Sequence, residues 1–362
     1  MLFVLTIVLY KTIICRMKIK LTSFIKFFTL SLLCIVTFAS CNTKQKNTID
    51  IAVFIPGIMA NSPTYALLDK GVRAAVEQYN QNIDTNTKAT VYTMEAGTNQ
   101  AQWQEKLTSL ASAKKYDVII SSNSSLPQLA LGVLEIFPNQ KFIFLDATME
   151  GNEQIATASY NQYEQSFLSG FASSLMSKNH KVAIIAAQEY PVMNNIIMPF
   201  FEMGAKYAYK DTQVDFRIVG NWYDANQGSL LADALINNGT DVILPICGGA
   251  AQGVINSAIN SKTYISWFDN NGFDYAPGTI VSSSTMNQEK LAFLYTSDYL
   301  SGKFYWGQTK EYGMKEGFVD FIEDDANYIN TVPQNVRDKI SVLVKKIKNG
   351  TVIICESGLI SK

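Results

Sequence analysis

Short apolar runs alternate with amphipathic stretches along most of this chain. Runs such as residues 49–55 and 181–186 are almost continuous in hydrophobic side chains, which is typical of strands buried on both faces of a sheet. Between such runs, stretches such as 65–79 place apolar side chains at helical spacing. Strands that alternate with helices in this way predict open, mostly parallel sheets with helices on their faces.

The pattern can be followed from residue 49 to about residue 350. The predicted strands are 49–55, 89–94, 116–123, 141–146, 155–160, 181–186, 215–219, 240–249, 263–269, 276–283 and one within 312–321. The predicted helices are 65–79, 99–113, 128–137, 165–176, 195–209, 228–238, 287–300 and 332–347, the last with Val336, Ile340, Val342, Leu343 and Ile347 facing the core. Since 181–186 resembles the first strand, we expect two similar lobes.

Two stretches with nearly the same layout support the two-lobe prediction. One runs from Asp117 to Asp146 and the other from Asp241 to Asp269. Each reads as a buried strand, a turn of small residues, a helix and a second strand that ends in aspartate. Because ligands of parallel sheets lie beyond the carboxyl ends of the strands, Asp146 and Asp269 are expected to face a cleft between the lobes.

The lobes are expected to exchange segments in the last quarter of the chain. We assign residues 49–160, about 285–310 and 333–350 to an N-terminal lobe. Residues 161–284 and about 311–332 are assigned to a C-terminal lobe.

The balance of charged residues and the lack of catalytic motifs indicate a binding protein. The 362 residues include 30 Lys and Arg against 31 Asp and Glu, so no basic field indicates nucleic acid as a partner. His180 is the one histidine, and it stands in a polar stretch that predicts a surface position. No metal-ligand cluster, nucleophile motif or phosphate-binding loop accompanies it, and Gly248-Gly249 lacks the P-loop lysine. We therefore expect neither an enzyme nor a bound cofactor or metal.

The N-terminus has the pattern of a bacterial secretory signal. Basic residues from Met17 onward precede an apolar stretch at 27–38, and small residues then lead to Cys41, with Phe38 an unusual third residue before it. This predicts a signal peptide over 1–40, with Met17 as the expected start. It also predicts a lipidated Cys41, a tether over 41–48, and a cell-membrane location facing the periplasm or the exterior.

The alternative for the N-terminus is a retained membrane helix, but its apolar core is shorter than the roughly 20 residues that a span requires. After cleavage Cys247 and Cys355 would remain, and we expect both as free thiols.

Several motifs in order resemble those of the basic membrane protein family. The resemblance covers residues 49 to about 350 and implies the type I periplasmic binding protein fold. It also implies a substrate-binding lipoprotein of an ABC transporter, with a permease as partner and, in the characterised branch, purine nucleosides as ligands. The motifs are 141–146 (KFIFLD), 163–170 (YEQSFLSG), 219–224 (VGNWYD), 241–243 with Gly248-Gly249, and 267–269 (WFD).

The resemblance implies roles for individual residues. Trp222 stands where the family has an aromatic residue that stacks on the base, and such stacking contributes on the order of 1–3 kcal/mol. Asp269 stands where a carboxylate accepts hydrogen bonds from the ribose hydroxyls, and Asp146, the matching acid of the first lobe, is expected at the base edge. The alternatives are a core or surface Trp222 and an Asp269 that caps a helix.

The first loop and one later position depart from the family pattern. The family has two acids followed by Ser-Phe-Asn, whereas residues 59–65 read MANSPTY. Tyr65 is the candidate for a second stacking ring, and Asn61 and Ser62 are candidates for polar contacts. The family's lysine after the crossing strand falls near Met286, which is no donor. Further ligand-binding candidates at strand ends are Asn123, Gly248 and Gly249.

The predicted function is capture of a small ligand between two closing lobes for import. A second reading is a ligand-sensing surface lipoprotein without a transporter, which would differ in having no permease and ATPase genes beside it. A third is an extracytoplasmic nucleoside-cleaving enzyme, which would require a base or metal site that the sequence does not reveal.

Overall fold

The computed structural model describes residues 48–82 and 87–361, although not the side chain of Asn61. From Thr48 onward the chain forms one compact unit. The predicted signal peptide, the lipidated Cys41 and most of the tether lie outside the described residues. No helix in the described ranges has the length and hydrophobicity needed to cross a membrane.

The first sheet is wholly parallel. Its strands lie in the order β11-β5-β4-β3-β1-β2. They are β1 (Thr48–Ile55), β2 (Lys88–Glu95), β3 (Val118–Ser122), β4 (Lys141–Leu145), β5 (Ile155–Tyr160) and β11 (Thr309–Tyr312). The central strands are buried on both faces because helices cover the sheet on each side.

The second sheet repeats the same plan. Its order is β12-β10-β9-β8-β6-β7, and its last pair, β10 with β12, is antiparallel. The strands are β6 (Lys181–Ala186), β7 (Gln213–Ile218), β8 (Val242–Ile246), β9 (Tyr264–Asp269), β10 (Ile280–Met286) and β12 (Val319–Phe321). The two-sheet, doubly wound α/β architecture predicted from the hydrophobic pattern is confirmed.

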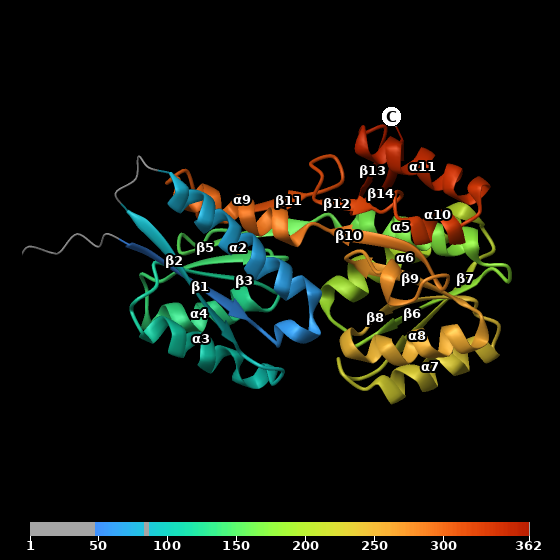
Figure 1. Ribbon diagram of the computed structural model, residues 1–362, viewed down its shortest axis with the longest axis horizontal. Helices are drawn as coiled ribbons and strands as arrows, with labels where there is room; N and C mark the ends of the chain where they lie inside the picture. The colour runs from blue at the N-terminus through green and yellow to red at the C-terminus, as the bar shows by residue number, and fades with distance from the viewer. Residues whose placement is uncertain (1–47, 83–86, 362) are drawn as a thin grey trace, which may run out of the picture. The chain divides into compact units, whose positions relative to one another are not determined.

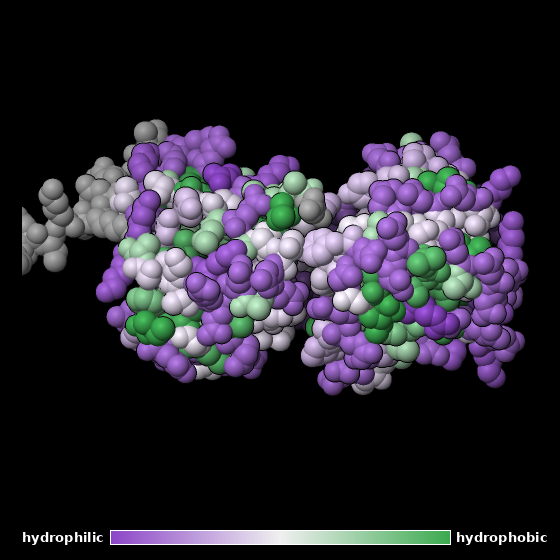
Figure 2. Space-filling model, turned by 90° about the horizontal axis from the view of Figure 1, so that it is seen from below, coloured by the Kyte–Doolittle hydropathy of each residue, from purple (hydrophilic) through white to green (hydrophobic). Residues whose placement is uncertain are grey.

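Helices lie on both faces of each sheet (Figure 1). In the first half α2 (Pro63–Gln81) packs on α9 (Gln288–Leu300), and α3 (Trp103–Ser112) packs on α4 (Leu126–Ile136). In the second half α5 (Gln162–Met176) packs on α6 (Met198–Ala208), and α7 (Ala225–Asn237) packs on α8 (Ala251–Ser261). The face formed by α3, α4, α7 and α8 is mostly hydrophilic with scattered apolar side chains (Figure 2).

The C-terminal helix corrects the lobe assignment. Helix α11 (Gln334–Lys348) packs against α5 and against the hairpin of β13 (Val352–Cys355) and β14 (Gly358–Ser361). The placing of 333–350 in the first lobe is therefore wrong, because the apolar face of α11 is buried against a helix of the second. Val342 is 53% exposed, so its predicted core position is also wrong, and Val344, at 1%, is buried instead.

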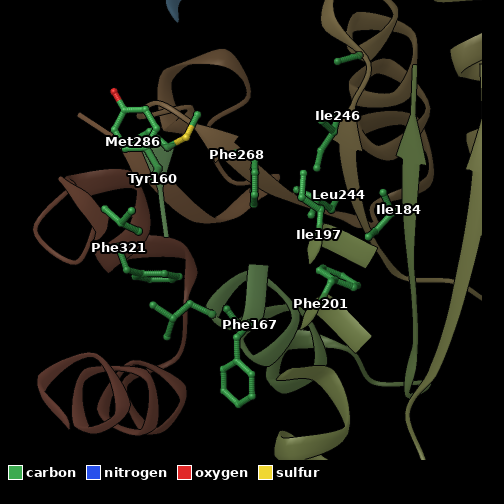
Figure 3. Packing of buried hydrophobic residues seen from close by; sticks show 14 of the residues in the cluster. Tyr160, Phe167, Ile184, Ile197, Phe201, Leu244, Ile246, Phe268, Met286 and Phe321 are labelled. Atoms are coloured by element: carbon green, nitrogen blue, oxygen red, sulfur yellow. The ribbon is translucent and has the colours of Figure 1, made fainter. Parts of the chain in front are cut away.

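Helices α5 and α6 approach each other unusually closely. A Cβ atom at Gly170 would lie 1.9 Å from the carbonyl oxygen of Phe201, and one at Gly204 would lie 1.9 Å from that of Phe167. Phe167 and Phe201 are both fully buried in the main hydrophobic cluster (Figure 3). This reciprocal glycine contact holds the two helices together at backbone distance.

The chain crosses between the sheets three times, and two of the crossings have the same sequence. After β5 the residues Asn161-Gln162 begin α5, and after β10 the residues Asn287-Gln288 begin α9. Each asparagine caps its helix by accepting a hydrogen bond, 3.1 Å long, from the backbone N–H three residues on. The third crossing joins β11 to β12.

The two crossings also contact each other reciprocally. The Tyr160 hydroxyl donates to Gln288 Oε1 at 2.7 Å, and Gln162 Nε2 lies 3.7 Å from Met286 Sδ as a donor. Tyr160 and Met286, which end β5 and β10, lie at the same end of the buried cluster in Figure 3. Each glutamine thus touches the last residue of the other crossing strand.

Candidate functional site

Two aspartates occupy the same place in the two sheets. Asp146 directly follows β4, and Asp269 ends β9, the strand that matches β4 in the second sheet. Both have left-handed backbone angles, with φ of 51° at Asp146 and 74° at Asp269. This conformation is uncommon for residues other than glycine and occurs preferentially at functional sites.

The first turn of α5 hydrogen-bonds to both aspartates. Gln162 Nε2 donates to Asp146 Oδ1 at 2.9 Å, and Gln165 Nε2 donates to Asp269 Oδ1 at 3.3 Å. The two glutamines are three residues apart and therefore lie on one face of the helix. Gln165 Nε2 also donates to the backbone oxygen of Ser284 in β10, at 3.2 Å. One helix end thus connects an acid of the first sheet with an acid of the second.

Asp146 lies close enough to Asp269 to influence its ionisation. Burial raises the pKa of Asp146 to about 6, against the lowering effect of the Gln162 hydrogen bond. Burial raises the pKa of Asp269 to about 7, the nearby charge of Asp146 adds to this rise, and the Gln165 hydrogen bond opposes it. Both residues are partly exposed, so a ligand from solvent can reach them.

Three tyrosines interact electrostatically with these acids. Burial raises the pKa of Tyr65 to about 12, while the charge of Asp146 adds to the rise and a hydrogen bond with Asn123 opposes it. The pKa values of Tyr160 and Tyr190 are also raised, first by burial and then by the charges of both aspartates. We call the set of Tyr65, Asp146, Tyr160, Gln162, Gln165, Tyr190 and Asp269 the acid cluster.

Trp222 and the two glycines lie together beside the acid cluster. The Trp222 ring centroid is 6.5 Å from that of Tyr190, at an interplanar angle of 38°. A Cβ atom at Gly248 would lie 2.9 Å from the Trp222 carbonyl oxygen, and one at Gly249 would lie 3.5 Å from it. Trp222 is partly buried against the core and so remains partly available for stacking.

Of the three candidate residues in and after the loop before α2, one is a member of the acid cluster. Ser62 stands at the N-cap of α2 without a side-chain cap bond, and Pro63 follows it at the first helical position. Asn61 ends a short 3₁₀ turn (Met59–Asn61), and its side chain is not described. Tyr65, in the first turn of α2, is the residue of this region that belongs to the acid cluster.

The structure excludes one alternative and reveals residues that the sequence analysis missed. Asp269 caps no helix, because the next helical turn, at Phe273–Tyr275, begins after Gly272. Gln162, Gln165, Tyr160 and Tyr190 were not predicted as site residues. The asparagine cap before Gln162 and the three-residue spacing of the glutamines were the signals that could have indicated two of them.

The remaining chemistry of the described residues is sparse. His180 is exposed and its ring meets the edge of Tyr209, with 4.7 Å between centroids. Cys247 is buried at the end of β8, and burial raises the pKa of its thiol to about 12, whereas Cys355 is partly exposed. Within residues 48–82 and 87–361, no group of three or more His, Cys, Asp or Glu side chains could hold a metal ion.

Comparison with known proteins identifies relatives among bacterial proteins. Basic membrane protein A1 of Borrelia garinii subsp. bavariensis is 29% identical over 198 residues, which are 54% of this chain and 57% of that protein. The chain therefore spans less than two thirds of this relative. The ABC transporter nucleoside-binding protein BmpA of Lactococcus lactis subsp. cremoris is 22% identical over 284 residues, covering 74% of this chain and 79% of that protein.

Solved structures show the same fold. An ABC transporter solute-binding protein from Aeropyrum pernix K1 superposes with a TM-score of 0.70 at 17% sequence identity, covering 84% of this chain and 92% of that one. A solute-binding protein from Conexibacter woesei DSM 14684 gives a TM-score of 0.63 at 13% identity and covers 86% and 99%. These matches confirm the type I periplasmic binding protein fold.

The sequence profile of one family covers nearly the whole described chain. This family, described as PnrA-like ABC transporter substrate-binding proteins, matches residues 48–354. The chain belongs to the PnrA-like family of ABC transporter substrate-binding proteins.

Proposed function

We propose that this protein captures a purine nucleoside between its two sheets and delivers it to an ABC permease, while a lipid on Cys41 holds it on the cell membrane facing the periplasm or the exterior. The observation that carries the proposal is the acid cluster, where one acceptor from each sheet stands beside several aromatic rings. The relative named as a nucleoside-binding protein supports the choice of ligand class.

Asp269 is suited to bind the ribose. An ionised carboxylate accepts two hydrogen bonds at once, as a vicinal diol requires, and each bond is charge-assisted. Gln165 Nε2 donates to Oδ1 of this carboxylate, at 3.3 Å. We therefore assign the ribose hydroxyls to Asp269, and the base edge, which presents further N–H donors, to Asp146.

Trp222 is suited to stack on the base, with Tyr65 as a second aromatic wall from the other sheet. Asn123 holds the Tyr65 hydroxyl by a hydrogen bond, so the ring has a defined orientation. Gly248 and Gly249 have no side chain to cover Trp222, which their backbones approach. Asn61 and Ser62 are proposed to add polar contacts from the loop before α2.

The net charge of the site also favours a nucleoside over a nucleotide. Within the part of the chain that the structure describes, no lysine or arginine contributes to the pKa of Asp146 or Asp269. Met286, at the place of the lysine expected from the family pattern, is 5% exposed and apolar. A phosphate beside two acids without a cation would be repelled.

The first test is the identity of the ligand that copurifies with the protein. The chain from Asn42 onward is purified and denatured, and the released small molecules are identified by mass spectrometry. A chemically intact purine nucleoside would support the proposal, whereas a sugar or a peptide would contradict the ligand class. Release of a free base and ribose would favour the nucleoside-cleaving alternative.

Trp222→Ala provides the second test. Loss of base stacking removes on the order of 1–3 kcal/mol, so nucleoside affinity measured by calorimetry should fall about tenfold. Trp222→Phe keeps an aromatic face, so its nucleoside affinity should fall less than that of Trp222→Ala. Equal affinity in all three proteins would show that Trp222 does not touch the ligand.

A further inference from the structure

We propose that Gln162 and Gln165 are the positioning residues of the ligand site, and that they hold Asp146 and Asp269 as oriented hydrogen-bond acceptors from a single helix end. The inference rests on the proposed function for what the acids bind, but the hydrogen bonds themselves join residues of this chain. Neither glutamine has been assigned a role above.

The first argument is the direction of the two hydrogen bonds. Each glutamine directs its amide nitrogen, a donor, at a carboxylate oxygen. A donor stabilises the ionised carboxylate, and in both acids this hydrogen bond is the influence that lowers the pKa against burial. Without the amides, the acids would retain their protons to higher pH and would accept fewer hydrogen bonds from a ligand.

The second argument is the cost of the arrangement. The amide oxygens Gln162 Oε1 and Gln165 Oε1 are buried without a hydrogen-bond partner among the described residues. Gln165 is itself fully buried. A buried, unpaired carbonyl oxygen is destabilising, and an apolar side chain would fill the same space without this penalty. Such a cost points to a role for the amide nitrogens rather than to packing.

The third argument is the fixed origin of both donors. Asn161 caps α5 at the crossing from the first sheet, and the glycine contact of Gly170 and Gly204 holds the helix against α6. Helix α5 is therefore held at its N-terminus and again near its middle. The start of α5 thus fixes the positions of the two carboxylates relative to each other, although they lie at strand ends of different sheets.

Other ionisable groups also face the pair and are part of the expected titration. Tyr65 of α2, Tyr160 of β5 and Tyr190, after β6, lie near the acids, and burial keeps all three protonated near neutral pH. On α5 itself Glu164 is nearby in sequence, but its carboxylate accepts from the Met314 backbone N–H at 2.7 Å, at the third crossing.

The test measures the ionisation of both acids directly. Protein from Asn42 onward, ligand-free and carbon-13 labelled in its aspartate carboxyl groups, is titrated by NMR, and the two signals are assigned by their loss in Asp146→Asn and Asp269→Asn. Gln165→Leu should raise the pKa of Asp269. Gln162→Leu should raise the pKa of Asp146. Because Asp146 then stays neutral to a higher pH, the pKa of Asp269 should fall.

A matched control and a second variant make the result decisive. Gln140 donates to the backbone oxygens of Tyr116 and Lys141, away from the acids, so Gln140→Leu should leave both titrations unchanged. Gln165→Glu keeps the side-chain shape but replaces the donor by an acid, so it should also raise the pKa of Asp269. Unchanged titrations in all the Gln162 and Gln165 variants would overturn the inference.

Guanosine binding by calorimetry separates this inference from the proposed function. If both are correct, Gln165→Leu weakens guanosine binding about tenfold at neutral pH, the usual effect of losing a charge-assisted hydrogen bond. If the titrations shift but guanosine binds to no variant or wild type, the positioning role stands and the nucleoside assignment fails. If guanosine binds and the titrations do not shift, the positioning role fails.

Discussion

The two halves of this protein place an aspartate at the same point of the sheet and in the same local geometry. The two aspartates differ in their pKa. Asp146 and Asp269 share their place after matching strands, their left-handed backbone and a glutamine donor from α5. However, burial and the charge of Asp146 raise the pKa of Asp269 to about 7, while burial raises the pKa of Asp146 to about 6. On raising the pH, Asp146 is expected to ionise first.

Under the proposed function, this difference in pKa gives the two acids different tasks. Asp146 is mainly ionised near neutral pH and can accept from N–H groups of a base. Asp269 gains its full acceptor capacity only at somewhat higher pH or when ligand hydroxyls stabilise its charge. Ligand binding is therefore expected to strengthen as pH rises through about 6 to 7 and to level off above about 8.

The largest expected effect comes from removing Asp269, the proposed acceptor for the ribose hydroxyls. Asp269→Asn replaces one acceptor oxygen by a donor and abolishes the charge, so two charge-assisted hydrogen bonds are lost or weakened. Since each contributes about 1.5–3 kcal/mol, guanosine affinity measured by calorimetry should fall at least about a hundredfold. Asp274→Asn, at an exposed position of the same half, is the control and should bind normally. Near-normal binding by Asp269→Asn would remove this residue from the ligand site.

A smaller effect is expected from the matching substitution in the first half. Asp146→Asn removes the partner charge, so the pKa of Asp269 should fall toward the usual range for aspartate and the pH profile of binding should move to lower pH. Affinity above pH 8 should fall about tenfold, because one charge-assisted contact to the base is lost. A profile with the same midpoint as that of the wild type would show that the two acids do not interact.

A separate effect is expected on the stability of the protein without added ligand. Asp146, Asp269 and Glu164, whose pKa burial raises to about 7, bind protons more tightly in the native state than in the unfolded state. Their combined contribution should therefore make the protein less stable as pH rises from about 4 to 7, with no further change above.

Denaturant unfolding at a series of pH values measures this slope. The triple variant Asp146→Asn, Asp269→Asn and Glu164→Gln should show a flatter dependence between pH 4 and 7. A wild-type slope retained in full by the triple variant would place the responsible groups elsewhere.

Much of the architecture could be predicted because hydrophobic runs report directly on buried strands. The spacing of 117–146 and 241–269 was enough to indicate two matching sheets and to place Asp146 and Asp269 at corresponding ends. The prediction for α11 was wrong because the apolar face of a helix can pack on any apolar surface. That it packs on α5 depends on a contact between residues far apart in the sequence.

The donors to the acids could not be predicted for a different reason. Periodicity reports on apolar positions, so the helix was expected to begin at Gln165, whereas the asparagine cap begins it at Gln162. The placing of Tyr190 near both acids likewise depends on the approach of two sheets, which no local pattern encodes. Polar site residues at helix starts are thus the ones that this kind of analysis most readily misses.

The contrast between the two described cysteines has a practical consequence for spectroscopy. A chain that starts at Asn42 contains only Cys247 and Cys355. The Cys247 thiol is buried, and because burial raises its pKa to about 12, little of the reactive thiolate exists at neutral pH. A maleimide dye should therefore attach selectively to Cys355 in the C-terminal hairpin, so the native sequence already provides a single labelling position.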